Sequence, residues 1–180
     1  TDANYSPIKP ADVDLLNLDD ETAGILVEQG PHNTVEDGSS ASFSVVLQSE
    51  PTGDVVIGYA TSDATEGVAN GTSLTFTAAN WNAPQTITVV GKDDFVADGN
   101  QPYRIDFAAG VSSDANYNGM VAPAANMINI DNETAGFIIN QISTDTTENG
   151  DEAEFTIVLT SEPTADVTLN FATDDATEGT

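Results

Sequence analysis

Large apolar residues alternate with polar ones over short segments of the chain, and helical spacing is nearly absent. In residues 41–47 ("ASFSVVL") and 54–61 ("DVVIGYAT"), a large apolar side chain recurs at every second position. Period-two alternation is typical of β-strands with one buried face. Clusters of Gly, Asp, Asn and Pro separate these segments and mark turns. The pattern therefore predicts an all-β chain.

Seven segments of this kind lie within residues 21–132. They cover residues 23–29, 41–47, 54–61, 73–77, 85–91, 103–109 and 126–130. Short alternating strands between turn clusters favour two antiparallel sheets packed face to face as a β-sandwich. We expect the inward side chains to form the core: Phe43, Val45, Leu47, Val55, Ile57, Tyr59, Leu74, Phe76, Ile87, Val89, Ile105 and Phe107.

The sequence repeats itself with a period of 112 residues. The letters "ETAG" occur at 21–24 and again at 133–136, and 25 of 48 positions are identical between 21–68 and 133–180 without a gap. A fixed period of domain length indicates tandem domains, each with its own core. We therefore expect three parts within a longer protein. They are the C-terminal tail of a preceding repeat (1–20), a complete repeat (21–132) and the N-terminal part of the following repeat (133–180).

The charge of the chain excludes several classes of function. There are 30 acidic and three basic residues, and the net charge is −27. A nucleic-acid binder needs a cationic surface, and an anionic membrane would repel this chain. No apolar run is long enough to insert into a membrane, and the lack of cysteine removes disulfides and thiolate metal sites. The acidity itself is explained either by solubility, which composition alone favours, or by cation binding.

Acidic residues gather where alternate strands of the predicted sandwich end. These strands run in the same sense, so their ends should converge on one pole. The oxygen-bearing residues there are Glu36, Asp63, Asp93, Asp94, Asp98, Asp131, Asn132 and Glu133. Carboxylates that lie close together repel one another unless protons or cations intervene. The turn propensity of Asp and Asn is the competing explanation, and it accounts less well for adjacent acids.

Ca²⁺ is the cation that suits this set of residues best. It takes about six to eight oxygen ligands in flexible geometry, including amide and backbone carbonyl oxygens. Zinc and copper favour His or Cys, and Mg²⁺ requires a tight octahedron. The only histidine, His32, stands alone in a polar segment, where we expect it at the surface. The sequence therefore predicts a calcium site at one pole of the sandwich.

Four segments in order resemble the Calx-beta domain family: "TVEDGSSASFSVVL", "YATSDATEG", "VVGKDDFVADG" and "INIDNETAG". The resemblance implies a seven-strand immunoglobulin-like sandwich that binds Ca²⁺ at one end, near the joint with the next domain. It adds the backbone carbonyl of Val96 to the ligands. Phe95, Gln101 and Asn132 stand where the family has acids, which implies fewer ions and weaker affinity. For the partial repeats it implies further ligands: Asp19, Asp20, Glu21, Glu148 and Asp175.

Several functions are compatible with these features. The leading hypothesis is a structural module whose partners are neighbouring repeats in a calcium-stiffened stalk or filament of a large secreted or cell-surface protein. One alternative is an adhesion module that binds a carbohydrate or a host protein through Trp81 and Tyr103. Another is a polymer in which partial sandwiches of different copies exchange strands. We do not expect an enzyme, because the acids lie in turns without a histidine partner.

Overall fold

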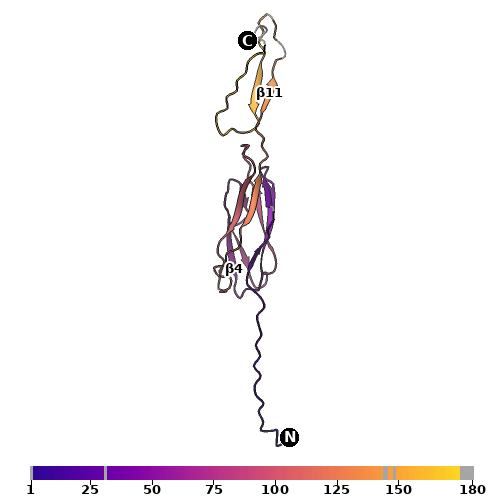
Figure 1. Ribbon diagram of the computed structural model, residues 1–180, viewed down its shortest axis with the longest axis vertical. Helices are drawn as coiled ribbons and strands as arrows, with labels where there is room; N and C mark the ends of the chain where they lie inside the picture. Colours follow the sequence, from indigo (N-terminus) through magenta and orange to yellow (C-terminus); the bar gives the residue numbers. More distant parts are fainter. Residues whose placement is uncertain (1, 31, 144–145, 148, 175–180) are drawn as a thin grey trace.

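A computed structural model describes residues 2–30, 32–143, 146–147 and 149–174 of the chain. Every regular element in these residues is a β-strand, and they include no helix long and apolar enough to cross a membrane. Residues 2–22 are exposed and include a turn at residues 3–7. After this turn the chain runs as an extended segment to one end of a sandwich, while the hairpin that contains β11 lies beyond the other end (Figure 1). The sandwich is thus entered at one pole and left at the opposite one.

Ten strands form the two layers of the sandwich. The first sheet is ordered β1 (Ile25–Val27), β3 (Ser40–Leu47), β7 (Gln85–Gly91) and β5 (Gly67–Ala69). The second sheet is ordered β2 (His32–Val35), β10 (Ala125–Ile130), β8 (Gln101–Phe107), β4 (Val55–Thr61) and β6 (Ser73–Phe76), and β9 (Val111–Ser112) pairs with β4. The chain is therefore an all-β, immunoglobulin-like sandwich with mostly antiparallel strands.

The seven predicted strands of residues 21–132 all form, and β2, β5 and β9 are additional. The strand predicted at 23–29 ends at Val27, after which the chain crosses to the other sheet and forms β2. There, β2 pairs with β10 in parallel, with His32 opposite Met127. This pair departs from the expected antiparallel pattern, because the chain changes sheets after β1 and enters the second sheet in the direction of β10.

The repeated sequence adopts the same strand register in both of its copies. In β11 (Phe137–Gln141) and β12 (Phe155–Leu159), Phe137 pairs with Leu159. The residues 112 positions earlier, Ile25 and Leu47, pair in the same way between β1 and β3. Identical pairing at the sequence period indicates that the β11–β12 hairpin corresponds to the first hairpin of the sandwich.

Residues 166–173 align with β4 at the period of 112 residues but do not form a strand. In the sandwich, β4 is held by β6, β8 and β9, all of which come from residues 73–112. The described residues after 133 include no equivalent of these partners. A strand that lacks ladder partners leaves its backbone groups unpaired and is not stable by itself.

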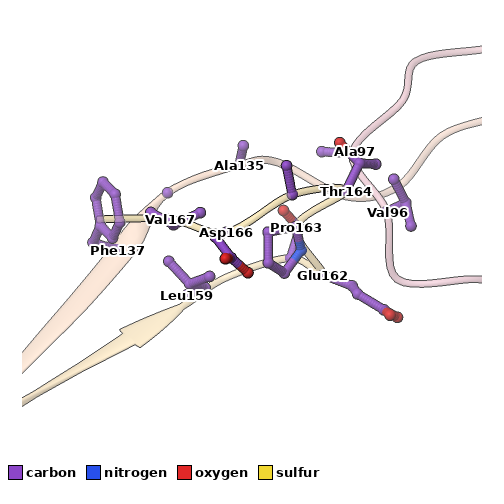
Figure 2. Close-up of a pocket in the computed structure, with 13 residues that line it drawn as sticks. Val96, Ala97, Ala135, Phe137, Leu159, Glu162, Pro163, Thr164, Asp166 and Val167 are labelled. Atoms are coloured by element: carbon purple, nitrogen blue, oxygen red, sulfur yellow. The ribbon is translucent and has the colours of Figure 1, made fainter. Parts of the chain in front are cut away.

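The β11–β12 hairpin contacts the sandwich through one short segment. Val96, in the loop after β7, forms a parallel bridge with Glu162, and the Glu162 N–H donates a hydrogen bond of 2.5 Å to the Phe95 carbonyl. Around this bridge, Val96, Ala97, Phe137 and Pro163 border a groove of about 460 Å³ (Figure 2). The loop after β7 therefore touches the residues that follow the sandwich.

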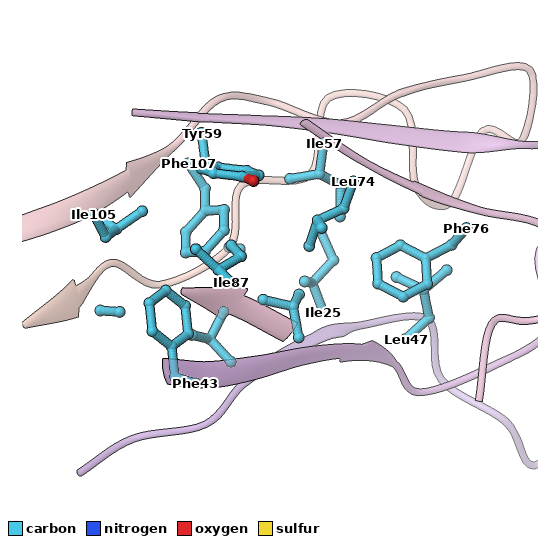
Figure 3. Packing of buried hydrophobic residues seen from close by; sticks show 14 of the residues in the cluster. Ile25, Phe43, Leu47, Ile57, Tyr59, Leu74, Phe76, Ile87, Ile105 and Phe107 are labelled. Atoms are coloured by element: carbon cyan, nitrogen blue, oxygen red, sulfur yellow. The ribbon is translucent and has the colours of Figure 1, made fainter. Parts of the chain in front are cut away.

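The core lies between the two sheets, where side chains such as Ile57 and Tyr59 from one sheet point toward Phe43 and Ile87 from the other (Figure 3). All twelve core residues predicted from the sequence are buried. Removing apolar surface from water contributes about 25 cal/mol per Å² and is the main stabilising term of such a core. The structure adds seven further buried apolar residues: Ile25, Val27, Tyr103, Tyr117, Ala122, Ala125 and Met127.

His32 was expected at the surface and is buried instead, with 9% of its surface exposed. Its ring lies 5.3 Å from the ring of Phe43, and its Nε2 lies 3.3 Å from the Glu28 carbonyl. The crossing of the chain between the two sheets turns this residue inward. The polar residues next to His32 in the sequence do not predict that crossing.

Phe43 and Phe155 occupy equivalent positions of the repeat and provide a matched test of the fold. Phe43 is 1% exposed and Phe155 is 50% exposed. We expect Phe43→Ala to cost the sandwich about 3–5 kcal/mol of unfolding free energy, and Phe155→Ala to change it by less than about 0.5 kcal/mol. Urea unfolding followed by fluorescence of the single tryptophan, Trp81, measures both. Equal losses in the two variants would contradict the assignment of the core.

Candidate metal centre

Loops from both sheets meet at the pole where the chain leaves the sandwich. The Glu36 N–H, after β2, donates to the Ile130 carbonyl at the end of β10 (3.1 Å). The Lys92 N–H, after β7, donates to the Glu66 carbonyl (3.0 Å). These backbone contacts bring acidic segments that are far apart in the sequence to a common end.

Three carboxyl groups form a compact cluster at this pole. One carboxylate oxygen each from Glu36, Asp131 and Glu133 lies within 4.8 Å of the others. Glu36 directly follows β2, and Asp131 directly follows β10. Because these two strands are parallel neighbours, with Val35 opposite Ile130, their following residues emerge side by side. The parallel pair is thus the structural cause of the cluster.

Backbone amides hold Asp131 in its ionised form. Its two carboxylate oxygens accept hydrogen bonds from the N–H groups of Glu133 (2.7 Å) and Gly99 (2.6 Å). These bonds lower the pKa of Asp131, because a hydrogen bond to the charged form favours it. Gly99 has a φ of 81°, a conformation that side chains other than glycine rarely adopt. The glycine therefore lets the loop after β7 reach Asp131.

Glu36 is the most buried acid of the cluster, with 1% of its surface exposed. Burial raises the pKa of Glu36 to about 7, assisted by a hydrogen bond to the Glu133 carboxyl and by the charges of Asp131 and Asp94. The Asn132 N–H, 3.4 Å from Glu36 Oε2, acts in the opposite direction. Without a cation, the pole thus retains a proton near neutral pH.

A divalent cation fits this arrangement as well as a proton does. The Oε2 atom of Glu133 is buried and has no hydrogen-bond partner in the described part of the chain. An orphaned buried carboxylate oxygen is costly, and coordination to a cation would satisfy it. Glu36, Asp131 and Glu133 would then supply oxygen ligands only, which suits Ca²⁺ and excludes a typical zinc or copper site. The cluster can therefore hold a metal ion.

A second group of acids lies next to the cluster, around the half-buried Glu66. Burial raises the pKa of Glu66, and the charges of Asp63, Asp98 and Asp94 raise it further. We did not predict Glu66 as a site residue. The available signal was the repetition of "DATEG" at 63–67 and 175–179, in which we selected only the aspartate.

Hydrogen bonds between buried polar residues hold the loops that surround the site. Asn129, which is fully buried, donates to the Lys92 carbonyl (2.9 Å) and to Glu66 Oε2 (3.4 Å). Its Oδ1 accepts a hydrogen bond from the Thr34 hydroxyl, 2.9 Å away. A Cβ on Gly91 would lie 2.7 Å from Asn129 Oδ1 and 2.3 Å from the Val35 carbonyl. Only glycine leaves space for this network.

The other predicted ligands of the complete repeat have simpler surroundings. Asp63 accepts hydrogen bonds from the backbone and hydroxyl of Thr65, which lower its pKa. Asp94 accepts from the Val96 N–H (2.7 Å), and the Val96 carbonyl accepts from the Asp98 N–H (3.0 Å). Asp93 is exposed. Of these residues, only Asp94 is among the charges that raise the pKa of Glu36, and none belongs to the three-carboxylate cluster.

The ligands expected for the preceding repeat are not part of this pole. Asp19, Asp20 and Glu21 are exposed and precede β1 at the entrance of the sandwich (Figure 1). The Glu21 N–H lies 3.4 Å from Asp19 Oδ1, which repeats the contact between Glu133 and Asp131. Glu148 and Asp175 lie outside the described residues.

Comparison with known proteins found similar solved structures but no matching family model or curated sequence. Among solved structures, the apo-form Calx CBD1 domain is 17% identical, with 63% of this chain and 100% of that chain covered and a TM-score of 0.49. CBD12 from CALX1.2 is 12% identical (76% and 69% covered, TM-score 0.45). The periplasmic chaperone SfaE is 8% identical, with a TM-score of 0.48, and the match covers 61% of this chain and only 58% of the chaperone. At these values the likenesses carry no argument about function.

Glu36 should make the metal-free protein less stable as the pH rises. Its pKa of about 7 in the folded state exceeds its usual 4.5, so folding binds a proton and stability falls between these two values. One pKa unit corresponds to about 1.4 kcal/mol, and the loss is therefore on the order of 3 kcal/mol. Urea unfolding at pH 5 and pH 8 in EDTA should show this loss in the wild type and much less of it in Glu36→Gln.

Glu50→Gln, at the opposite pole, is the matched control and should keep the wild-type loss. A Glu36→Gln variant that loses as much stability as the wild type would show that Glu36 does not titrate in this range.

Proposed function

We propose that residues 21–132 form a calcium-binding structural repeat in which Glu36, Asp131 and Glu133 bind the ion. The observation that carries the proposal is the partly buried three-carboxylate cluster, in which one buried oxygen, Glu133 Oε2, lacks a hydrogen-bond partner among the described residues. The resemblance of the sequence to Calx-beta domains agrees with it. The further acids Asp94 and Glu66 provide a negative field that attracts a cation to the pole.

The ion would join two segments of the sandwich directly and hold a third indirectly. Glu36 belongs to the end of β2, and Asp131 and Glu133 belong to the exit from β10. Asp131 is also bonded to Gly99, so the loop after β7 would be fixed indirectly. Bound Ca²⁺ would replace the proton of Glu36 and satisfy the orphaned oxygen of Glu133. Its binding energy would therefore add to the stability of the fold.

The same ion would restrict the joint between repeats. Only residues 134–136 separate Glu133 from the first strand of the following hairpin. There is no glycine- and serine-rich linker, which would be flexible. A ligand at the start of this short connection limits the directions in which the next repeat can leave. Repeats joined in this way would make a stiff stalk or filament.

We place this stalk in a secreted or cell-surface protein, with neighbouring repeats as its partners. A calcium site that lacks several acids suits extracellular calcium, for which site affinities of about 10⁻⁴–10⁻³ M suffice. The net charge of −27 would keep separate stalks apart in solution. The chain would act through its length and stiffness.

The two alternatives have less support from the residues that they require. Of the aromatic contacts expected for an adhesion site, Tyr103 is 6% exposed and its hydroxyl is hydrogen-bonded to Thr34 (2.9 Å). Trp81 packs against the core. Strand exchange would place residues 13–18, which align in sequence with β10, in the partial sandwich of another copy, and among the described residues they pair with no strand.

Calcium should raise the melting temperature of the protein. An ion at 100 times its dissociation constant adds about 2.7 kcal/mol, which corresponds to a shift of between about 5 and 15 °C for a domain of this size. We expect Asp131→Asn to lose most of the shift and Asp54→Asn, at the opposite pole, to keep it. Differential scanning calorimetry in Ca²⁺ and in EDTA measures the shift. An identical melting temperature in both buffers would refute the proposal.

Calcium should also change the shape of a longer array. A chain of three repeats should have a larger maximum dimension in Ca²⁺ than in EDTA, because bound ions limit bending at the joints. Small-angle X-ray scattering measures this dimension. If the dimension and flexibility are unchanged while the melting temperature still rises, the ion stabilises each repeat but does not stiffen the stalk.

A further inference from the structure

The loop after β7 combines acids with an uncharged centre. Asp93 and Asp94 precede this centre, Asp98 follows it, and the residues between them are Phe95, Val96 and Ala97. The acids face the candidate metal centre or the solvent. The uncharged centre is the part that contacts residues beyond the sandwich, because Val96 forms its bridge with Glu162.

The contact is made by the backbone and does not depend on charged side chains. The Glu162 N–H donates to the Phe95 carbonyl (2.5 Å), and the Glu162 carboxylate points away from the groove (Figure 2). Val96 and Ala97 form one side of that groove, and Pro163 belongs to the other. The loop thus extends the edge of the "SEPT" turn at residues 161–164 by one backbone pair.

The complete repeat carries the same turn at residues 49–52, on the pole where the chain enters. There the Ser49 N–H donates to the Tyr117 hydroxyl (3.1 Å), and the Thr52 N–H donates to the Asp114 carboxylate (2.8 Å). Glu50 is exposed, and among the hydrogen bonds of the described residues its N–H makes none. Glu50 is the equivalent of Glu162 at the period of 112 residues. The backbone N–H of Glu162, which follows the sandwich, is therefore hydrogen-bonded, whereas that of Glu50, at the entrance pole, has no hydrogen-bond partner among the described residues.

We infer that the "SEPT" turn is a docking site for the Phe95–Ala97 segment of the preceding repeat. Its occupant is another copy of the same domain, and every joint of the array would contain one such backbone pair. The inference rests on the proposed tandem arrangement but does not require a bound ion. It assigns a role to Phe95 and Val96 at a position where the resemblance predicts only metal ligands.

The charges explain why an uncharged segment makes this contact. Asp19, Glu21 and Glu50 border a pocket of about 400 Å³ at the entrance pole, and the approaching loop is acidic as well. Like charges in contact would repel each other. A backbone hydrogen bond flanked by apolar residues avoids that repulsion, and only the flanking acids remain in solvent.

Amide hydrogen exchange in the 180-residue chain tests the docking with an internal control. Glu50 and Glu162 have the same neighbours, Ser and Pro, so their unprotected amides exchange at closely similar rates. We expect the Glu162 amide to exchange at least about tenfold more slowly than the Glu50 amide, because a hydrogen-bonded amide must open before it exchanges. Equal exchange of the two amides, measured by NMR, would overturn the inference.

A pair of variants provides a second readout. Glu162→Pro removes the N–H, and Glu162→Ala retains it. We expect Glu162→Pro to let the β11–β12 hairpin tumble independently of the sandwich, as measured by ¹⁵N relaxation, while Glu162→Ala behaves like the wild type. Because residue 162 lies outside the sandwich, spectra of the sandwich show directly that it remains folded. Unchanged tumbling of Glu162→Pro would contradict the docking.

Exchange in EDTA separates this inference from the calcium proposal. Slow exchange at Glu162 in a protein whose melting temperature does not respond to Ca²⁺ would refute the calcium site and support the docking. Equal exchange at Glu50 and Glu162 in a protein that is stabilised by Ca²⁺ would refute the docking alone.

Discussion

The structure depends on how three neighbouring carboxyl groups, one of them almost fully buried, are accommodated at one pole of the sandwich. Glu36, Asp131 and Glu133 lie within a few ångströms of one another, and Glu36 is almost inaccessible to water. Charged oxygens in such a place are stable only if a proton or a cation is shared among them. Protonation of Glu36, whose pKa is raised, is one way to meet this condition. A bound cation is the other, and only the cation also satisfies the orphaned oxygen of Glu133.

The fold creates this constraint through one unusual strand pair. The chain changes sheets after β1, so β2 lies parallel to β10 in a sandwich that is otherwise antiparallel. Parallel neighbours end at the same edge, which places the residues after both strands together. The buried Asn129 and the glycine at position 91 keep the neighbouring loops close. Packing of the core fixes the position of the two sheets, and the ends of β2 and β10 then fix the positions of the three carboxylates.

The sequence was sufficient to predict the strands of the complete repeat and its core, because period-two alternation reports directly on burial. It also indicated that acids gather at one pole. The change of sheets and the burial of His32 were not predictable, since they depend on a crossing that has no periodic signal. Glu66 was missed although Asp63 of the same turn was predicted at the pole, because a turn has no periodicity that shows which of its acids faces inward. Residues 166–173 have the letters of a strand but lack its partners.

Two features of the structure limit movement at the joint between repeats. The short connection after Glu133 limits the length of the joint, and the bridge between Val96 and Glu162 defines one contact across it. The loop after β7 takes part in both, since Gly99 holds Asp131. A structural change at the metal centre would therefore be transmitted to the neighbouring repeat through a few covalent and hydrogen bonds.

A crystal structure of the protein grown with excess Ca²⁺ tests the calcium site most directly. We predict an electron-density peak within about 2.3–2.6 Å of carboxylate oxygens of Glu36, Asp131 and Glu133, with an anomalous signal that water cannot give. A map that shows only water among these three side chains, at calcium concentrations in the millimolar range, would contradict the assignment of this pole as a calcium site.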